Sequence, residues 1–412
     1  MPSPPGLDAR RAALSMLDAV MRQGRTLDSA SSSSRIPLGA DDGRLALAIA
    51  GETLRRIPAL DNLIDSRTRQ RLPDDSKARM VLRLALAQKL ALEIPDHAIV
   101  ATALPLVDGG PRRLVHGVLG ALLRGKLEPD AALPQAVEDR WSKAWGEAVV
   151  AAAQRMILQR PPLDLSFRDE ASAQAYPRGS SLAPKHRRLE SAAVTGLPGY
   201  DEGKWWVQDL ATSLPARLIP QSAEHVLDLC AAPGGKTMQL AAAGHVVTAL
   251  DRSKSRLARL RDNLARTGLD ARTIVADALE WRTDESYDAV LVDAPCSATG
   301  TFRRHPEVVY RARDSIIAAS GELQGQLLDR AAGVVGVGGS LIYAVCSLEP
   351  DEGEHQVRGF LDRHRYFRLE PATLDIAGLT SSPEGWLRVL PVMLEAEGGL
   401  DGFFTAHLVR DR

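Results

Sequence analysis

The first third of the chain carries apolar residues at helical spacing. In the segment 9–23, Ala12, Met16 and Val20 recur at intervals of four, which places them on one side of a helix. The same periodicity predicts further helices at 44–57, 77–92, 114–123 and 133–157. Proline and glycine separate these segments. The pattern therefore predicts a small all-α bundle.

From about residue 205 the pattern changes to short β-branched runs that alternate with helical segments. The runs lie at 225–230, 246–250, 273–275, 289–292 and 340–345, and helical patterns at 253–267 and 319–335. This alternation predicts a mostly parallel sheet with helices on both faces, the Rossmann-like α/β class. Two late runs, 386–390 and 403–409, predict an antiparallel pair at the edge of that sheet.

A break between the two patterns begins at Pro161 and Pro162. The stretch 163–200 is polar and rich in glycine and proline, so no regular element is expected there. We therefore expect three parts. They are an all-α domain at 1–160, a linker or small N-terminal subdomain of the catalytic part at 161–204, and a Rossmann-like domain at 205–412.

Composition adds limits to this picture. The 412 residues carry a net charge of −1, which gives no overall indication of a nucleic-acid partner. Three cysteines are too few and too far apart for a disulfide framework or a zinc site, so we expect a reduced, cytoplasmic protein without a metal. Neither a signal peptide nor a membrane-spanning run of about 18 apolar residues is expected.

A glycine-rich turn follows the first predicted strand of the sheet. It comprises Cys230, Ala231, Ala232, Pro233, Gly234, Gly235 and Lys236. Ligands of such sheets bind at the carboxyl ends of the strands, beside turns of this kind. A Walker A motif requires glycine at the position of Cys230, and the dinucleotide pattern G-x-G-x-x-G is also absent, so a nucleoside triphosphate is disfavoured.

Three acidic residues, Asp251, Asp277 and Asp293, follow the next three predicted strands. Asp251 could accept hydrogen bonds from ribose hydroxyls, although it could instead cap the helix that begins near Ser253. Asp277 could accept one from an adenine amino group. Acids at three successive strand ends favour a nucleoside without a polyphosphate, such as S-adenosylmethionine.

Cys296 and Cys346 follow the fourth and fifth predicted strands, at the same edge as the glycine-rich turn. They could be small buried hydrophobic residues, as we expect for Cys230. Their position instead favours chemistry, because a thiolate that adds to carbon 6 of a cytosine makes carbon 5 nucleophilic. A protonated Asp293 could support protonation of N3. The target base must leave its stack to reach such groups.

At these residues the chain resembles the NOL1/NOP2/Sun family of RNA cytosine-5 methyltransferases. The resemblance is carried by DLCAAPGGKT at 228–237, DAPCSATG at 293–300, RRHPE at 303–307, CSLEP at 346–350 and DGFF at 401–404. It covers about 205–412, and the front third resembles the NusB-like RNA-binding domain of the same enzymes. The chain departs from the family pattern at Ala298, Val345 and Gly353.

The resemblance implies that Cys346 attacks the base and that Cys296 promotes product release. It implies S-adenosylmethionine as cofactor and RNA, specifically 16S rRNA, as substrate of a monomeric enzyme. The expected cofactor-binding residues are Cys230, Ala231, Ala232, Pro233, Gly234, Gly235, Lys236, Asp251, Arg256, Asp277 and Asp293.

Two alternatives remain open at this point. An amino-group methyltransferase would need neither cysteine, and its usual Asp/Asn-Pro-Pro-aromatic signature is replaced here by Asp293-Ala-Pro-Cys296. A non-catalytic RNA-binding assembly factor would fit the helical front domain. Retention of both cysteines and of three acids at the expected cofactor site argues against it.

Overall fold

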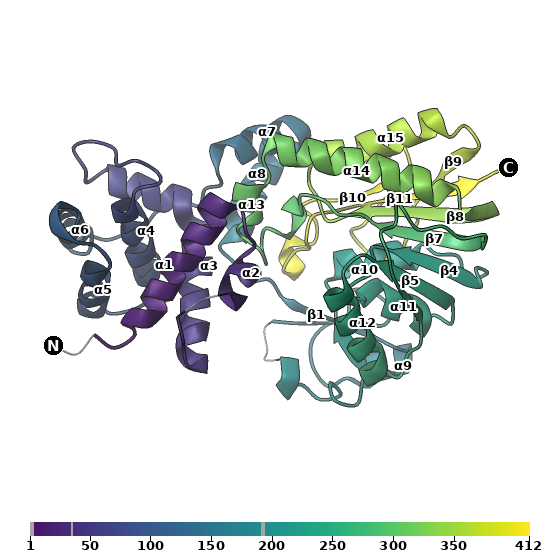
Figure 1. The fold of residues 1–412 in the computed structure, drawn as a ribbon, viewed down its shortest axis with the longest axis horizontal. Coiled ribbons are helices and arrows are strands. Elements are labelled where there is room, and N and C mark those ends of the chain that lie inside the picture. Colours follow the sequence, from purple (N-terminus) through teal and green to yellow (C-terminus); the bar gives the residue numbers. More distant parts are fainter. Residues whose placement is uncertain (1–3, 34–35, 191–193) are drawn as a thin grey trace. The chain divides into compact units, whose positions relative to one another are not determined.

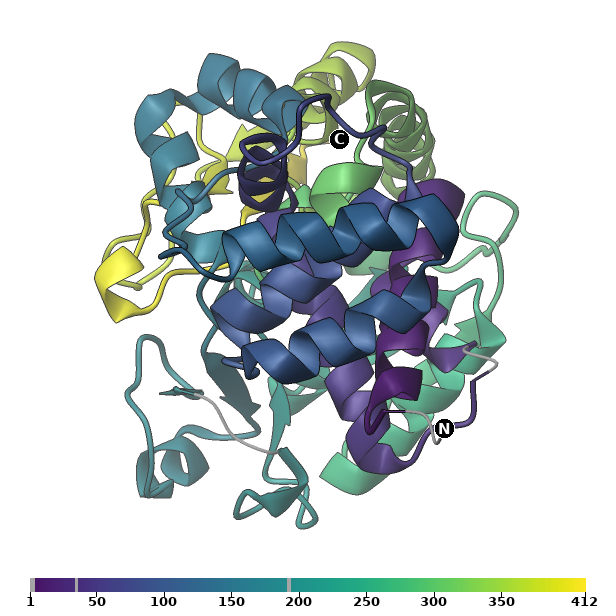
Figure 2. The ribbon, with the colours of Figure 1, turned by 90° about the vertical axis from the view of Figure 1, so that its left-hand side faces the viewer.

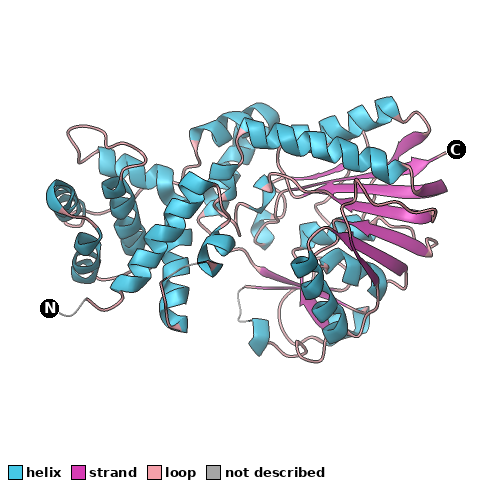
Figure 3. Cartoon of the chain, in the orientation of Figure 1, coloured by secondary structure: helices cyan, strands magenta, loops and turns pink. Residues whose placement is uncertain are grey.

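The computed structural model describes residues 4–33, 36–190 and 194–412, and the chain forms two compact units. The first comprises Met1–Arg140, Ala153–Gln159 and Arg304–Arg311, and the second comprises Trp141–Ala152, Arg160–Arg303 and Ala312–Arg412. Figure 3 shows all the strands in the second unit. The three-part division expected from the sequence stays a prediction.

The first unit is built from helices, which Figure 2 shows face on in purple and blue. Its main elements are α1 (Leu7–Gln23), α2 (Leu27–Ser32), α3 (Ala40–Asp65), α4 (Lys77–Ala91), α5 (Asp96–Ala103), η1 (Leu104–Leu106) and α6 (Gly109–Leu122). The helices predicted at 9–23, 44–57, 77–92 and 114–123 correspond to α1, α3, α4 and α6. The helical spacing of the apolar residues was sufficient here, because α1, α3 and α6 each bury one face and α4 is buried on most of its sides.

The helix predicted at 133–157 is wrong in one respect. The segment forms two helices, α7 (Gln135–Trp145) and α8 (Glu147–Ile157). Gly146 lies between them at a φ of 85°, a left-handed conformation that suits glycine and ends a helix. The apolar periodicity continues across the break, which is why the sequence pattern did not show it.

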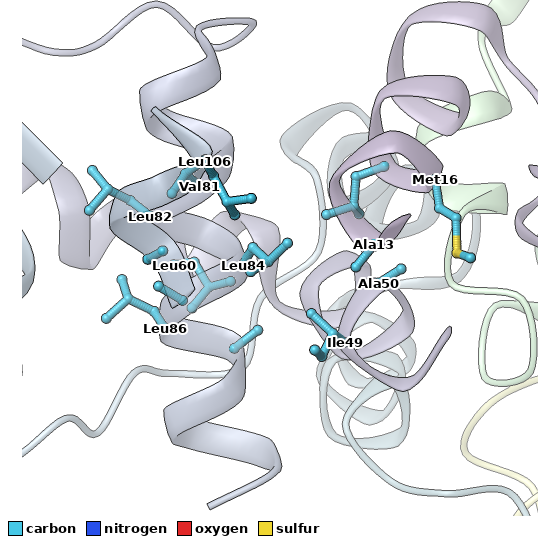
Figure 4. Packing of buried hydrophobic residues seen from close by; sticks show 14 of the residues in the cluster. Ala13, Met16, Ile49, Ala50, Leu60, Val81, Leu82, Leu84, Leu86 and Leu106 are labelled. Atoms are coloured by element: carbon cyan, nitrogen blue, oxygen red, sulfur yellow. The ribbon is translucent and has the colours of Figure 1, made fainter. Parts of the chain in front are cut away.

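Small residues allow the helices of the first unit to pack closely. Figure 4 shows Ala13 of α1 beside Ile49 and Ala50 of α3, all within one buried cluster. Leu82 and Leu84 of α4 belong to the same cluster and are fully buried. Helix α4 is buried on most of its sides, and its buried Arg79 and Arg83 both form ion pairs with Asp61.

A late segment of the chain completes the first unit. It includes α13 (Val308–Arg311), more than 180 residues after α6. The Tyr310 hydroxyl donates to the Leu54 carbonyl at 2.8 Å, and the Leu27 amide donates to Glu307 Oε1 at 3.0 Å. Local periodicity could not predict this return, because its partners are distant in sequence.

The second unit is built on an eight-stranded sheet. Its strands are β4 (His225–Leu229), β5 (Val246–Asp251), β6 (Arg272–Val275), β7 (Tyr287–Asp293), β8 (Val335–Val345), β9 (Phe367–Glu370), β10 (Leu387–Val389) and β11 (Phe403–Arg410). The order is β10-β11-β8-β7-β4-β5-β6, and β9 also pairs with β11. Strands β4 to β8 are parallel and β9 to β11 antiparallel, which confirms the predicted mostly parallel sheet with an antiparallel edge.

Helices cover both faces of this sheet (Figure 1). Side chains alternate along each strand, so Leu227 and Leu229 of β4 face one cluster and Val226 faces the other. The first cluster includes residues of α14 (Asp314–Ala332) and α15 (Glu354–Arg363), and the second includes residues of α10 (Leu210–Arg217) and α11 (Gly235–Ala242). The helices predicted at 253–267 and 319–335 correspond to α12 (Lys254–Thr267) and α14, although the second ends earlier than predicted.

The stretch 163–200 is more regular than predicted, and its residues 191–193 lie outside the described part. It contributes β1 (Leu163–Phe167), α9 (Glu170–Ala175) and β2 (His186–Leu189), and with β3 (Trp205–Val207) the strands form an antiparallel sheet ordered β2-β1-β3. The buried carboxylate of Asp164 accepts two hydrogen bonds of 2.7 Å from Arg188. The expectation of irregular structure was wrong. Asp164 and Arg188 look like surface positions in the sequence, but they are buried as a pair between two strands.

The register of the parallel strands brings their carboxyl ends to one edge. Leu229 of β4 lies opposite Leu250 of β5 and Val292 of β7, and Asp293 lies opposite Ala344 of β8. Residues that directly follow these strands therefore meet at this edge. Over the described ranges, no helix combines the length and apolarity that a membrane span requires.

Candidate active site

The glycine-rich turn connects β4 to α11, as predicted, and the residues that follow are held against β5. The Ala231 amide donates to the Leu250 carbonyl at 3.1 Å. Gly234 has a φ of 109°, and a Cβ atom there would lie 2.1 Å from Leu260 Cδ1. A Cβ atom on Gly235 would meet Gln208 at an ordinary 3.6 Å. Glycine is therefore required at 234 by the fold itself.

Asp251 ends β5 and is almost fully buried behind the turn. Its Oδ2 accepts from the Ala232 amide at 3.2 Å, and its Oδ1 accepts from the Ser253 amide at 2.8 Å. Arg256 also reaches this place, because its guanidinium donates to the Ala232 carbonyl and lies 3.5 Å from Asp251 Oδ2. The cap of α12 is the Ser253 hydroxyl, which accepts from the Arg256 amide. Asp251 therefore does not cap that helix.

Asp277 lies in the turn after β6 and is exposed. Its Oδ1 accepts from the Leu279 amide at 2.9 Å, which closes the turn. Of the predicted cofactor acids, this one has the fewest contacts with the glycine-rich turn, and it keeps a carboxylate oxygen open to solvent.

Asp293, at the end of β7, forms an ion pair with Lys236 of the turn. Lys236 Nζ lies 2.7 Å from Asp293 Oδ2, and the ammonium also lies 5.4 Å from the centre of the Phe403 ring. The side chain of Asp293 is 33% exposed, so the pair is open on one side. The structure thus joins two residues that the sequence placed in the cofactor site separately.

A further acid, Asp228, is buried in β4 behind the turn. Its Oδ2 accepts from the Thr237 hydroxyl at 2.6 Å, whereas Oδ1 has no hydrogen-bond partner among the described residues. Burial, with help from the nearby carboxylates of Asp293 and Asp251, raises the pKa of Asp228 to about 7. The charged form of this carboxyl group is thus destabilised in the folded protein.

We expect D228N to stabilise the protein at alkaline pH. The folded state holds the Asp228 proton more tightly than the unfolded chain, so the free energy of unfolding of the wild type falls as pH rises from about 4 to about 7. Asparagine carries no charge and keeps an acceptor for Thr237. The stabilisation by D228N should grow over that interval and then level off, on the order of 4 kcal/mol.

Urea unfolding at about pH 5 and about pH 8 would measure this difference. The exposed Asp262 provides a matched control, because D262N removes the same charge from the surface. A D228N protein less stable than the wild type at the higher pH would contradict the expectation.

Cys296 and Cys346 meet at the edge of the sheet. Their Sγ atoms lie 3.5 Å apart, although the residues are 50 positions apart in sequence. Neither is fully buried. The hydrogen bond to Cys346, followed by burial, raises the pKa of Cys296 well above its ordinary value. Cys296 thus keeps its proton and can donate a hydrogen bond to the Cys346 sulfur.

Cys230 differs from the other two thiols. It adopts a left-handed φ of 61° at the start of the turn and packs against the core cluster of the sheet. Burial raises the pKa of Cys230 to about 12, so this thiol is a poor nucleophile. Cys296 and Cys346 also pack against core clusters, so the packing role expected for Cys230 stays a prediction.

The sequence did not indicate how the two cysteine loops are held together. The serines that follow Cys296 and Cys346 both contact the buried carboxylate of Glu352. The repeated Cys-Ser pair at two strand ends was the available signal. That pattern could not show what the two serines contact, because Glu352 belongs to neither Cys-Ser pair.

The residues at this edge fit S-adenosylmethionine. The carboxyl groups of Asp251 and Asp293 contact the turn, Asp228 contacts Thr237 directly after it, Asp277 follows the neighbouring strand β6, and the one lysine of the turn is already paired. Such a set suits a ligand with a sulfonium and an ammonium group, and it repels a polyphosphate. The unpartnered Oδ1 of Asp228 is consistent with a cationic ligand. No group of three metal-ligating side chains that could bind a metal is found over residues 4–33, 36–190 and 194–412.

Comparison with protein families gives two matches. A family described as 16S rRNA methyltransferase RsmB/F matches residues 215–409, and the NusB family matches residues 7–124. Proteins called ribosomal RNA small subunit methyltransferase B from Erwinia tasmaniensis and Sodalis glossinidius are 32% and 34% identical to this chain. These matches cover 96% and 98% of this chain and 96% and 97% of those proteins.

Solved structures support the fold. The structure described as that of PH0851 superposes with a TM-score of 0.74 over 99% of both chains, at 24% identity. A methyltransferase homolog protein from Pyrococcus horikoshii superposes with a TM-score of 0.55, at 25% identity, over 67% of this chain and 95% of its own.

These comparisons confirm the predicted NusB-like domain, the Rossmann-like methyltransferase domain and the cofactor. They also confirm that the resemblance noted in the sequence motifs reflects true relationship. The chain belongs to the RsmB/F family of S-adenosylmethionine-dependent 16S rRNA methyltransferases.

Proposed function

We propose that this rRNA methyltransferase modifies carbon 5 of a cytosine through a covalent bond between Cys346 Sγ and carbon 6 of the base. The observation that carries the proposal is the 3.5 Å separation of two thiols at the edge of the sheet where the glycine-rich turn lies. Methyl transfer to an amino group requires no thiol. Two adjacent thiols suit a reaction in which one sulfur bonds to the base and the other assists.

The reaction begins when the Cys346 thiolate adds to carbon 6 of a base that has left its stack. Electron density then moves toward carbon 5 and N3, and N3 takes up a proton. The cofactor supplies a methyl group on a cationic sulfur. After carbon 5 has bonded to that methyl group, its hydrogen leaves as a proton to water. The carbon–sulfur bond then breaks, Cys346 returns as a thiolate and N3 gives back its proton.

Cys296 assists the last step in this proposal. Because the pKa of Cys296 is raised well above its ordinary value, the residue remains a thiol and donates a hydrogen bond to the departing Cys346 sulfur. Such a bond stabilises a leaving thiolate relative to the adduct. Cys296 therefore promotes product release without itself bonding to the base.

Asp293 and Lys236 are proposed to hold the proton at N3. The ammonium of Lys236 lies 2.7 Å from the Asp293 carboxylate, so the pair contains a proton that can be shared with a base placed against it. The open side of Asp293 leaves room for such a contact. The protonated Asp293 expected from the sequence stays a prediction.

The remaining assignments extend this proposal. We infer that residues 230–236 with Asp251, Arg256, Asp277 and Asp293 bind the cofactor, and that the helical residues 1–160 contact the RNA as part of a monomer. In support, Arg256 and Asp251 both contact the glycine-rich turn.

Release of the carbon 5 hydrogen provides the test. We expect 16S rRNA labelled with tritium at carbon 5 of cytosine to lose one tritium for each methyl group transferred. The reaction replaces that hydrogen, whereas methylation of an amino group leaves it in place. Scintillation counting of released water and incorporated methyl groups gives the ratio. Methyl incorporation without tritium release would favour an amino-group methyltransferase, and the absence of both would favour an assembly factor.

A further inference from the structure

A buried carboxylate outside the proposed reaction, Glu352, lies beneath the two cysteines. The residue is fully buried at the start of the segment that leads into α15. Its Oε1 accepts from the Ser297 amide at 2.7 Å, and its Oε2 accepts from the hydroxyl groups of Ser297 and Ser347. One side chain thus contacts the residue that follows each reacting thiol.

These contacts join two loops. The first cysteine loop, residues 294–300, follows β7, and the second cysteine loop, residues 346–349, follows β8. Further links are present, since the Gly300 amide donates to the Cys346 carbonyl at 3.0 Å and the Leu348 amide donates to Thr299 Oγ1 at 3.0 Å. Glu352 differs from these links because it accepts hydrogen bonds from both serines at once.

The outer sides of the loops are also supported. Gln324 of α14 donates to the Pro295 carbonyl at 2.9 Å, and Trp145 donates through its indole to the Leu348 carbonyl at 2.8 Å. Glu352 adds contacts that reach the serine after each thiol, and these contacts help to fix how closely the two thiols approach.

A buried carboxylate is costly unless its charge is balanced. No lysine, arginine or histidine lies within ion-pair distance of Glu352 in the described part of the chain. Burial raises the pKa of Glu352, which shows that the site does not favour the charge. Stability alone therefore gives little reason for an acid here. The contacts to both serines supply a different reason, since they fix geometry.

We propose that Glu352 is a positioning residue that sets the distance between the Cys296 and Cys346 sulfur atoms. The side chain acts through Ser297 and Ser347 and does not touch the base. Its effect on catalysis rests on the proposed function above, whereas its effect on the thiols does not. Loss of the acceptor leaves the Ser297 amide unsatisfied and removes the carboxylate that both serine hydroxyls share, so we expect the two loops to shift apart.

Thiol cross-linking without RNA tests the geometry directly. Diamide oxidises two adjacent thiols to a disulfide, and the two electrons and two protons reduce its diazene to a hydrazine. Peptide mapping identifies the Cys296–Cys346 bond. We expect E352A to form it at least about tenfold more slowly than the wild type, because the reaction requires contact between the sulfur atoms. E352Q retains an acceptor, so its rate of disulfide formation should lie within about threefold of the wild-type rate.

D164N serves as a control for general destabilisation. Asp164 is equally buried, but its partners Arg188 and Leu210 lie far from the cysteines in sequence and belong to other elements. Cross-linking in D164N should match the wild type at a temperature well below unfolding. Equal loss of cross-linking in D164N and E352A, or none in E352A, would overturn the proposal. If E352A does not fold, S297A and S347A each remove one contact and should each slow cross-linking.

Kinetics separates positioning from substrate binding. With 16S rRNA and S-adenosylmethionine, E352A should lower kcat by about 10–100-fold, the effect of a displacement of reacting groups by a fraction of an ångström to one ångström. The KM for RNA should stay within about twofold. A change in KM alone would overturn the proposal. Slow cross-linking in E352A together with no tritium release by the wild type would instead contradict the cytosine carbon 5 mechanism and leave the positioning role intact.

Discussion

Replacement of Cys346 by alanine is expected to abolish methyl transfer, by at least about 10⁴-fold in kcat, because no other group can form the bond to carbon 6. Neither of the other two cysteines can replace it as the nucleophile. The raised pKa of Cys296 keeps that residue a thiol, and burial raises the pKa of Cys230, which packs against the core cluster, to about 12.

The same variant is expected to bind S-adenosylmethionine with unchanged affinity. Cys346 lies at the end of β8, whereas the glycine-rich turn follows β4 and is held by β5. Calorimetric titration of C346A would measure binding, and transfer of a labelled methyl group would measure turnover. C346S is the matched control, since serine keeps the size and a hydrogen bond to Cys296 but is a far weaker nucleophile. Methylation by C346A above about one per cent of the wild-type rate would refute the assignment of the nucleophile.

Replacement of Cys296 by alanine is expected to give a different phenotype, the accumulation of a covalent protein–RNA adduct. Cys346 can still attack the base and the methyl group can still be transferred. The departing sulfur, however, has lost the hydrogen-bond donor that lies 3.5 Å away. Loss of one charge-stabilising donor at a reacting centre costs about 10²–10³-fold in rate, so release becomes the slow step.

Denaturing gel electrophoresis with labelled 16S rRNA would detect the adduct as a band of reduced mobility. The double variant C296A/C346A is the matched control, because it lacks the attacking sulfur and should give no such band. An equally strong adduct in the double variant would show that the bond forms elsewhere. Rapid multiple turnover by C296A without adduct would show that Cys296 has no part in release.

Several elements were predictable because the signals that define them are local. Apolar residues at helical spacing identified α1, α3, α4 and α6, because the residues that define each of these helices are neighbours in the sequence. The alternation of strands and helices identified the parallel sheet. The same signals could not reveal the break at Gly146, because the apolar periodicity continues across it. They also missed the sheet of β1, β2 and β3, because two charged residues of its strands, Asp164 and Arg188, are buried as a pair.

The candidate site shows the same division. Residue identity was enough to select Cys296, Cys346 and the acids at the strand ends, because carboxyl ends of parallel strands share one edge. Sequence could not show that Lys236 pairs with Asp293, nor that a residue six positions after Cys346 would join the two cysteine loops. Each of these contacts depends on strand register and side-chain direction.

The sequence by itself determined the two kinds of architecture, the positions of most strands along the chain and the residues available for chemistry, because these follow from periodicity and residue type over short stretches. Only the tertiary structure decided which of those residues meet. It brought two sulfur atoms 50 positions apart to 3.5 Å, placed a buried carboxylate beneath them, and returned residues 304–311 to the first unit. Such contacts are set by strand pairing and by the packing of distant segments, and no local pattern encodes them.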